Sequence, residues 1–431
     1  MSRERRWRGY VLWVGAVAWA VLTDVARDSF AQNLLGGVLG RVVFVVIAAL
    51  ALYWLISNPP EWWHRFQRWR RGEPVQPAPA PGQTELQSLA EQAQRWLFAL
   101  GSDRGGMLAA DWFRREERRL RRLLAESEVR PDTVDDLAWI CDGLEAVYVR
   151  QRRADDLLEL STQLAKIGEQ AGRRDLEELA AVRAATAYRL RGNLDEATYR
   201  LGLASSLAPR GRAAAAMRAR RQLERGLIHL ARADQLHPGA DRTDAVLGAR
   251  DRFDDAGLAI PRADLAADIA IHLNIGVVYL YQHDADKALD HLRLAAARAS
   301  ASRDASAQAH ALELTGVAAW LQHNRPQALR WWREAERRYT DVDEPEGVGR
   351  CLQHLGSAAL LGGAAEQACE LLERSAKLRS GVTGHEVRER YLTQARAQLG
   401  QGTDRPGEPA PRPPRGGPLQ QLLRLWRTRW R

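Results

Sequence analysis

The sequence predicts an all-α protein, a stack of helix pairs preceded by a helical hairpin in a membrane. Three observations lead to this fold class. Residues 84–400 are rich in Ala, Leu, Arg and Glu, and their apolar positions recur at spacings of three and four, as in amphipathic helices. The same region is self-similar, with a repeat period of about 40 residues. Two long apolar runs precede it, within residues 1–58.

Composition excludes several other classes of protein. The 431 residues are 45% hydrophobic and 27% charged, which is too apolar for a chain disordered throughout. The 18 prolines follow no period, so a collagen-like fibre is excluded. Three cysteines, Cys141, Cys351 and Cys369, are too few for a disulfide framework and indicate a reducing compartment or no redox role.

Residues 7–26 and 34–57 are predicted to span a membrane as two helices. A spanning helix needs about 20 mostly apolar residues, and both segments reach that length. Gly36 and Gly40 have the Gly-x-x-x-Gly spacing that lets two membrane helices approach closely. This spacing suits packing of the hairpin on itself or a homodimer in the membrane. A cleaved signal peptide is the alternative for the first segment, although it lacks a small-x-small cleavage site.

The net charge of +9 is concentrated beside the apolar runs. Residues 1–8 and 61–71 each carry a net +3 and residues 419–431 carry +4, which together exceed the net charge of the chain. The positive-inside rule therefore predicts a two-span protein of the inner (plasma) membrane with both termini and the helical region in the cytoplasm. Because the helical region is nearly neutral, no specific nucleic-acid partner is expected.

Two segments, 59–71 and 419–431, are predicted to lie on the lipid bilayer as amphipathic helices. Their aromatic residues recur at helical spacing among arginines, namely Trp62, Trp63, Phe66 and Trp69 in the first and Trp426 and Trp430 in the second. Residues 72–83 and 401–418 are proline-rich linkers on either side of the helical region. A protein groove and acidic nucleic acid remain alternative targets for the C-terminal segment.

Small residues at a fixed phase mark the repeat within residues 84–400. Glycines recur once per period at Gly276, Gly316 and Gly356, and alanines follow each of them by twelve at Ala288, Ala328 and Ala368. The bulky residues Leu292, Trp332 and Leu372 are expected to fill the gap beside them. A helix pair of this kind cannot bury its apolar face alone, so neighbouring pairs must stack into a solenoid.

On these residues the chain resembles the tetratricopeptide repeat family, over roughly residues 132–400. In that family a glycine in the first helix precedes an aromatic residue by three, and alanine, a bulky residue and alanine follow along the second helix. Gly276, Tyr279, Ala288, Leu292 and Ala295 follow this order. The period of about 40 exceeds the family's usual ~34 and implies longer helices.

One repeat departs from this spacing. Ala249, Phe253 and Ala256 match a second helix, but the first helix around Gly226 lies about eleven residues too far upstream. Residues 237–241 are predicted to form the intervening loop. The family's peptide-carboxylate clamp is not carried over, because no lysine lies beside Asn274.

Motifs for catalysis, metals or cofactors are not found. His283 and His323 occupy the same phase of successive repeats and are interpreted as turn residues in left-handed backbone. The cysteines lack the spacing of a zinc site, and no glycine-rich loop is followed by lysine. We therefore expect neither an enzyme nor a cofactor.

The resemblance implies a ligand groove lined by first helices. It places in this groove Asn274, Tyr281, His310, Glu313, Trp320, Arg350, Gln353 and His354. Aromatic, amide and charged groups together suit a protein or peptide partner. The predicted function is a membrane-anchored cytoplasmic adaptor or scaffold. The alternative is a regulatory protein that senses a peptide or another ligand.

Overall fold

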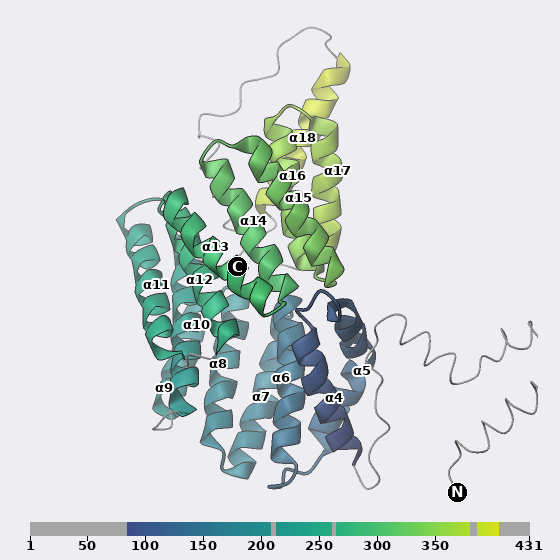
Figure 1. The fold of residues 1–431 in the computed structure, drawn as a ribbon, viewed down its shortest axis with the longest axis vertical. Helices are drawn as coiled ribbons and strands as arrows, with labels where there is room; N and C mark the ends of the chain where they lie inside the picture. Colours follow the sequence, from purple (N-terminus) through teal and green to yellow (C-terminus); the bar gives the residue numbers. More distant parts are fainter. Residues whose placement is uncertain (1–83, 208–212, 261–263, 380–385, 405–431) are drawn as a thin grey trace, which may run out of the picture. The chain divides into compact units, whose positions relative to one another are not determined.

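The computed structural model describes residues 84–207, 213–260, 264–379 and 386–404, which lie in one compact unit. These ranges contain fifteen α-helices and no strand, and each helix packs against the next one along the chain (Figure 1). The prediction of an all-α fold is confirmed, and the stacking of successive helices is that of an α-solenoid.

The helices are numbered α4 to α18. Their bounds are α4 Glu85–Ala99, α5 Gly106–Glu126, α6 Val134–Arg150, α7 Ala154–Ala171, α8 Arg174–Leu190, α9 Leu194–Leu207, α10 Ala213–Gln235, α11 Ala240–Ala259, α12 Leu265–Tyr281, α13 Ala285–Ala301, α14 Ala305–Leu321, α15 Arg325–Asp341, α16 Pro345–Leu361, α17 Ala365–Leu378 and α18 Glu386–Asp404.

First and second helices of a pair differ in how much of their surface is buried. In α12, a first helix, eleven of the 17 residues are buried. In α15, a second helix of equal length, the buried residues are Ala328, Trp332, Ala335 and Tyr339. Second helices therefore carry one apolar stripe and face solvent on the other side, whereas first helices are packed on most sides.

Turns within the pairs use left-handed residues, as predicted for the two histidines. His283 and His323 have φ of 61° and 60°, and Gly363 at the same place in the next repeat has φ of 83°. The amide of Asn324 then donates to the Ala319 carbonyl at 2.9 Å, which closes the end of α14. The Asn324 side chain caps α15 by accepting from the Gln327 amide. The interpretation of His283 and His323 as turn residues is confirmed.

The repeated glycines face the bulky residues of their own pair. A Cβ on Gly316 would lie 2.5 Å from the Trp332 indole nitrogen, and one on Gly356 would lie 2.8 Å from Leu372 Cγ. Both distances are too short for a real contact. The first helix can therefore pack this closely against the second only because these positions are glycine.

In the irregular repeat, formed by α10 and α11, the extra residues lengthen the two helices. Helix α10 has 23 residues and α11 has 20, compared with 17 in α12 to α16. The predicted loop 237–241 is corrected to residues 236–239, since α11 already begins at Ala240. Gly226 nevertheless faces Phe253, because a Cβ there would lie 2.3 Å from its ring.

The buried core is divided along the described helices. One cluster of buried apolar residues runs from α4 to α8, and another from α10 to α18. Between them lies a small cluster shared by α8, α9 and α10. Helix α10 therefore contributes side chains to two of these clusters.

The predicted location in a membrane needs correction. Within the described ranges, no helix is both long and apolar enough to cross a bilayer. The assignment as a two-span inner-membrane protein is wrong on this finding and is withdrawn. The predicted spans 7–26 and 34–57, with Gly36 and Gly40, lie outside the described residues, as do both tryptophan-bearing segments and the linker 72–83. The predicted second linker, 401–418, is corrected at its start, because α18 continues to Asp404, and its remaining residues lie outside the described ranges.

Candidate functional site

The eight predicted groove residues do not line one open groove. Six of them are buried, and only His310 and Arg350 are partly exposed. Glu313, Arg350, Gln353 and His354 meet in one polar network between α14 and α16. Their role in partner binding stays a prediction.

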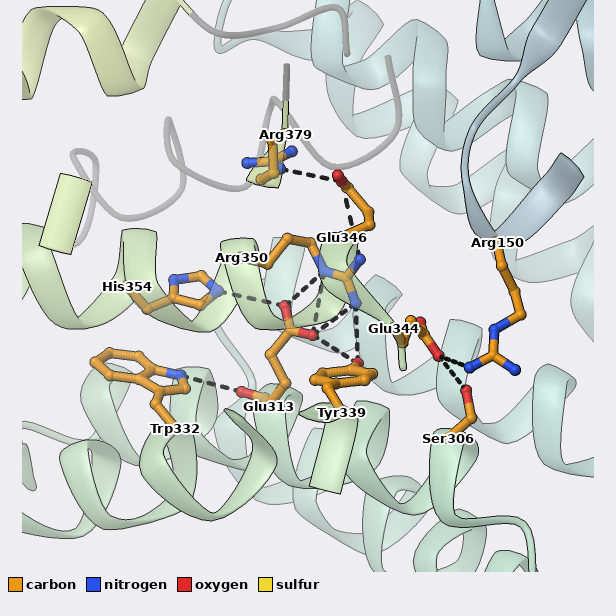
Figure 2. A network of polar contacts seen from close by, with 10 residues as sticks. All are labelled: Arg150, Ser306, Glu313, Trp332, Tyr339, Glu344, Glu346, Arg350, His354 and Arg379. Carbon is orange, nitrogen blue, oxygen red and sulfur yellow. Dashed lines mark hydrogen bonds and ion pairs between the residues drawn. The ribbon is translucent and has the colours of Figure 1, made fainter. Parts of the chain in front are cut away.

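Glu313 is the centre of this network (Figure 2). Its carboxylate, fully buried, accepts from Arg350 Nε at 3.1 Å and Nη2 at 3.0 Å, and from the Tyr339 hydroxyl at 2.9 Å. His354 Nε2 lies 3.4 Å from the same carboxylate. The Trp332 indole N–H donates to the Glu313 carbonyl at 3.1 Å. The network therefore joins α14, α15 and α16.

The charges in the network stabilise one another. Burial alone would lower the pKa of Arg350, but Glu313, Tyr339 and Glu346 together outweigh it and hold that pKa well above its ordinary value. Burial and the Glu313 charge both raise the pKa of Tyr339. A carboxylate and a guanidinium out of water need such pairing, and removing one partner leaves an unpaired buried charge.

Arg379, at the end of α17, extends the network. Its Nε lies 3.1 Å from Glu346, and its Nη1 donates to the Gln353 amide oxygen. The Arg379 stem passes over Gly349, where a Cβ would lie 2.5 Å from Arg379 Cγ. Burial lowers the pKa of this guanidinium, with Glu346 opposing that shift.

The other four predicted residues do not share the Glu313 carboxylate contacts described above. The Asn274 amide donates to the Ala270 carbonyl of its own helix at 2.7 Å, and the Tyr281 hydroxyl donates to Asp234 on α10. Trp320 packs against Trp332 with ring centroids 5.6 Å apart. His310 is half-buried on α14.

A second polar contact joins helix pairs far apart in the sequence. Arg150, at the end of α6, donates to the Val342 carbonyl at 3.1 Å. It also pairs with Glu344 at 3.1 Å (Figure 2). The amide of Ala305 donates to the Gly101 carbonyl at 2.7 Å. We call these three pairings, together with that of Arg150 to the Leu100 carbonyl, the clasp.

A third feature is a row of basic side chains on α10. Arg218, Arg221, Arg225, His229 and Arg232 are spaced by three or four residues and share one side of the helix. We call this row the α10 basic face. It lines two cavities, both of which include Arg225 in their walls.

The first of these cavities, which we call the arginine pocket, has a volume of about 250 Å³. Its wall comes from α9, α10 and α11 and consists of Thr198, Leu201, Arg225, Ile228, His229, Arg232 and Arg252. The second, of about 360 Å³, lies toward the ends of α10 and α11 and is lined in part by Asp255 and Leu258. The wall of the arginine pocket contains no acidic residue, so its charge favours anions.

Some of these residues were identifiable in the sequence and others were not. Arg218–Arg225 stands out as an arginine cluster, although a charged run on a helix is usually a solvated face. Arg379, Glu346 and Arg150 carry no sequence signal, because their contacts depend on how the helix pairs stack. Among the described residues, no group of three or more His, Cys, Asp or Glu side chains is arranged to hold a metal ion.

Comparison by sequence finds no match, either to a protein-family model or to a curated relative. Among solved structures, the chain is similar to the aspartyl phosphate phosphatase F of Bacillus subtilis, with a TM-score of 0.39 and 14% sequence identity. The similarity covers 76% of this chain and 85% of that one. A likeness this distant identifies the chain neither with that protein nor with its activity.

Proposed function

We propose that this chain is a protein-binding α-solenoid of the tetratricopeptide type, an adaptor that holds a partner by an acidic segment. No reaction is part of this proposal. The repeat type is supported by the constant phase of Gly276, Gly316 and Gly356 and by the left-handed turns that follow each of their helices.

The observation that carries the proposal is the arginine pocket together with its surroundings. Three guanidinium groups line one cavity whose wall has no carboxylate. Large apolar side chains lie exposed on the same helices, with Tyr199 59% exposed on α9 and Leu258 89% exposed on α11. Arginine and exposed aromatic or aliphatic groups together are typical of surfaces that bind proteins.

The predicted groove is a less favourable surface for this function. Glu313, Gln353 and His354 are buried and engaged with one another or with Arg379. A partner would have to break these contacts before it reached them, at a cost of several kcal/mol for a buried ion pair. On the α10 basic face, Arg221 is likewise buried and paired with Glu178. Arg218, Arg225 and Arg232, however, are at least partly exposed and require no such rearrangement.

The test is a pair of charge reversals matched in net charge. Arg218→Glu with Arg252→Glu changes the α10 basic face and the facing wall of the arginine pocket, and Arg330→Glu with Arg333→Glu changes two exposed arginines on α15. Proteins that co-purify with the full chain from its native host are expected to be lost from the first variant and kept by the second. Loss from both variants alike, or from neither, contradicts the proposal.

A ligand-responsive regulator is the second candidate, and the clasp favours it. Arg150 and Glu344 are 194 residues apart, yet they form an ion pair with side chains only 17% and 13% exposed. A ligand that binds more tightly to the solenoid with the clasp open would shift the equilibrium between closed and open clasp toward the open state. Faster hydrogen exchange at the Ala305 amide on addition of a ligand would support this function, and unchanged exchange would oppose it.

A further inference from the structure

The arginine pocket has fewer acidic partners than guanidinium groups. Arg232 lies 3.2 Å from Asp195, and Arg252 lies 3.1 Å from Asp255. Neither carboxylate belongs to the pocket wall, and the Asp195 side chain is 98% exposed, where an ion pair contributes little. The three arginines of the pocket therefore have two carboxylates as ion-pair partners, both at the protein surface.

Arg225 is the guanidinium without a carboxylate in ion-pair contact among the described residues. Its Nη2 donates to the Ser205 hydroxyl at 2.8 Å and its Nη1 to the Gln222 amide oxygen at 3.3 Å, and both acceptors are neutral. Burial, and then the charge of Arg252, lower the pKa of Arg225, with only Asp255 opposing that shift. The pocket thus holds like charges close together with little compensation.

The rest of the wall is suited to hold an oxyanion on a carbon chain. The Thr198 hydroxyl accepts from Arg232 Nη2 at 3.2 Å and donates to the Leu194 carbonyl of its own helix at 2.8 Å, so it holds the Arg232 guanidinium at the pocket wall. Burial, and then Arg232 and Arg252, lower the pKa of His229 against the opposing charge of Asp251, and a pKa below the ordinary value leaves the imidazole mostly neutral near pH 7. Leu201 and Ile228 supply an apolar floor.

We propose that the arginine pocket binds the phosphate group of a phosphorylated side chain on the partner. A phosphate monoester carries a charge of about −1.5 to −2 and three oxygens, and guanidinium groups bind such oxygens in pairs. A carboxylate has one charge and two oxygens, so it leaves one of the three arginines without a partner. This inference rests on the proposed function for the partner, and it adds the chemistry that the pocket selects.

The first experiment uses the full chain and small probes. ³¹P NMR line broadening measures binding of inorganic phosphate and of N-acetyl-phosphoserine amide, and N-acetyl-glutamate amide is tested as a competitor at equal concentration. Phosphoserine is expected to bind at least ~10-fold more tightly than glutamate, because it adds a further charge-assisted hydrogen bond. Equal affinities of phosphoserine and glutamate would overturn the inference.

Two matched variants locate the binding. Arg252→Gln is expected to weaken phosphoserine binding by ~10-fold or more, because its side chain, 41% exposed, is available to the pocket. Arg330→Gln on α15 is expected to leave it unchanged. Thermal melting of both variants checks that they fold. An equal effect of the two variants would show general charge attraction and overturn the assignment to this pocket.

A second arm separates this inference from the proposed function. The co-purified partner is treated with a broad-specificity protein phosphatase before it is added back to the full chain. Loss of binding on dephosphorylation supports the inference. Binding that survives dephosphorylation but is lost in the Arg218→Glu, Arg252→Glu variant overturns the inference and leaves the proposed function in place. Binding that survives both treatments overturns both.

Discussion

Glu313 and Arg350 lie 37 residues apart, on α14 and α16, and form a two-point ion pair inside the solenoid. The Glu313 side chain is fully buried, and that of Arg350 is 13% exposed. The pair therefore fixes how two neighbouring first helices are positioned along each other, since a shift of either would separate both hydrogen bonds.

Glu313→Gln is expected to destabilise the protein strongly. The change leaves Arg350 as a buried cation without its full partner, and removing one member of a buried ion pair costs about 3–5 kcal/mol. Urea unfolding followed by circular dichroism measures the effect. Glu366→Gln, at an exposed position on α17, is the matched control and is expected to stay within about 0.5 kcal/mol. Similar losses for both variants would contradict the stabilising role of the pair.

Gly316→Ala is expected to destabilise the pair α14–α15 by about 1–3 kcal/mol, the usual range for overpacking. The new methyl group would lie 2.5 Å from Trp332 Nε1, and Trp332 is fully buried, so neither group has room to move. The change in unfolding midpoint measures this. Gly202→Ala on α9 is the control, because no atom lies within 4 Å of its Cβ. There, alanine's higher helix propensity should raise stability slightly.

The repeat period predicts those features that each helix pair builds for itself. Gly316 against Trp332 and the left-handed turn at His323 follow from the position of the residue in its own pair. The burial of Glu313 does not follow from its position in its own pair. A charged residue on a helix is expected to face solvent unless a neighbouring helix pair is known to cover it. Arg350 supplies the missing partner only when α16 stacks on α14.

Contacts between helix pairs that are far apart in the sequence cannot be predicted from the repeat pattern. Arg150 meets Glu344 across 194 residues, and this depends on the accumulated rotation from one helix pair to the next. The α10 basic face lies between these cases. Its spacing is visible in the sequence, whereas the cavity beside it depends on how α9, α10 and α11 pack together.

Arg150→Ala is expected to open the clasp without unfolding the helix pairs. The variant loses the bonds to Leu100, Val342 and Glu344, while the core clusters on either side keep their contacts. Hydrogen exchange by mass spectrometry should show faster exchange at Ala305 and Ser306, whose amides donate to Gly101. Arg114→Ala, which removes a pairing with Asp343 between exposed side chains, is the control and should change exchange far less.

Stability is expected to fall as the pH drops below about 6.5, because the protein contains a half-buried histidine pair. His272 Nδ1 lies 3.0 Å from His291 Nδ1, a contact that allows only one hydrogen between the two nitrogens. Burial lowers the pKa of both rings. The charge of Arg298, on α13, lowers the pKa of His272 further, and Asp268 opposes that shift. The charge of Arg250, on α11, lowers the pKa of His291, and nearby carboxylates oppose that shift.

The sign of this effect follows from where the protons bind. With the folded pKa below the unfolded one, the unfolded chain takes up more protons near pH 6, so the free energy of unfolding rises with pH until it levels above about 6.5. His291→Gln removes one of the two titrating rings and should flatten that slope, measured from urea unfolding between pH 5 and pH 7.5. His237→Gln, at an exposed position between α10 and α11, should leave the slope as it is. A slope unchanged by His291→Gln would mean that protonation of this pair does not govern the acid sensitivity of the fold.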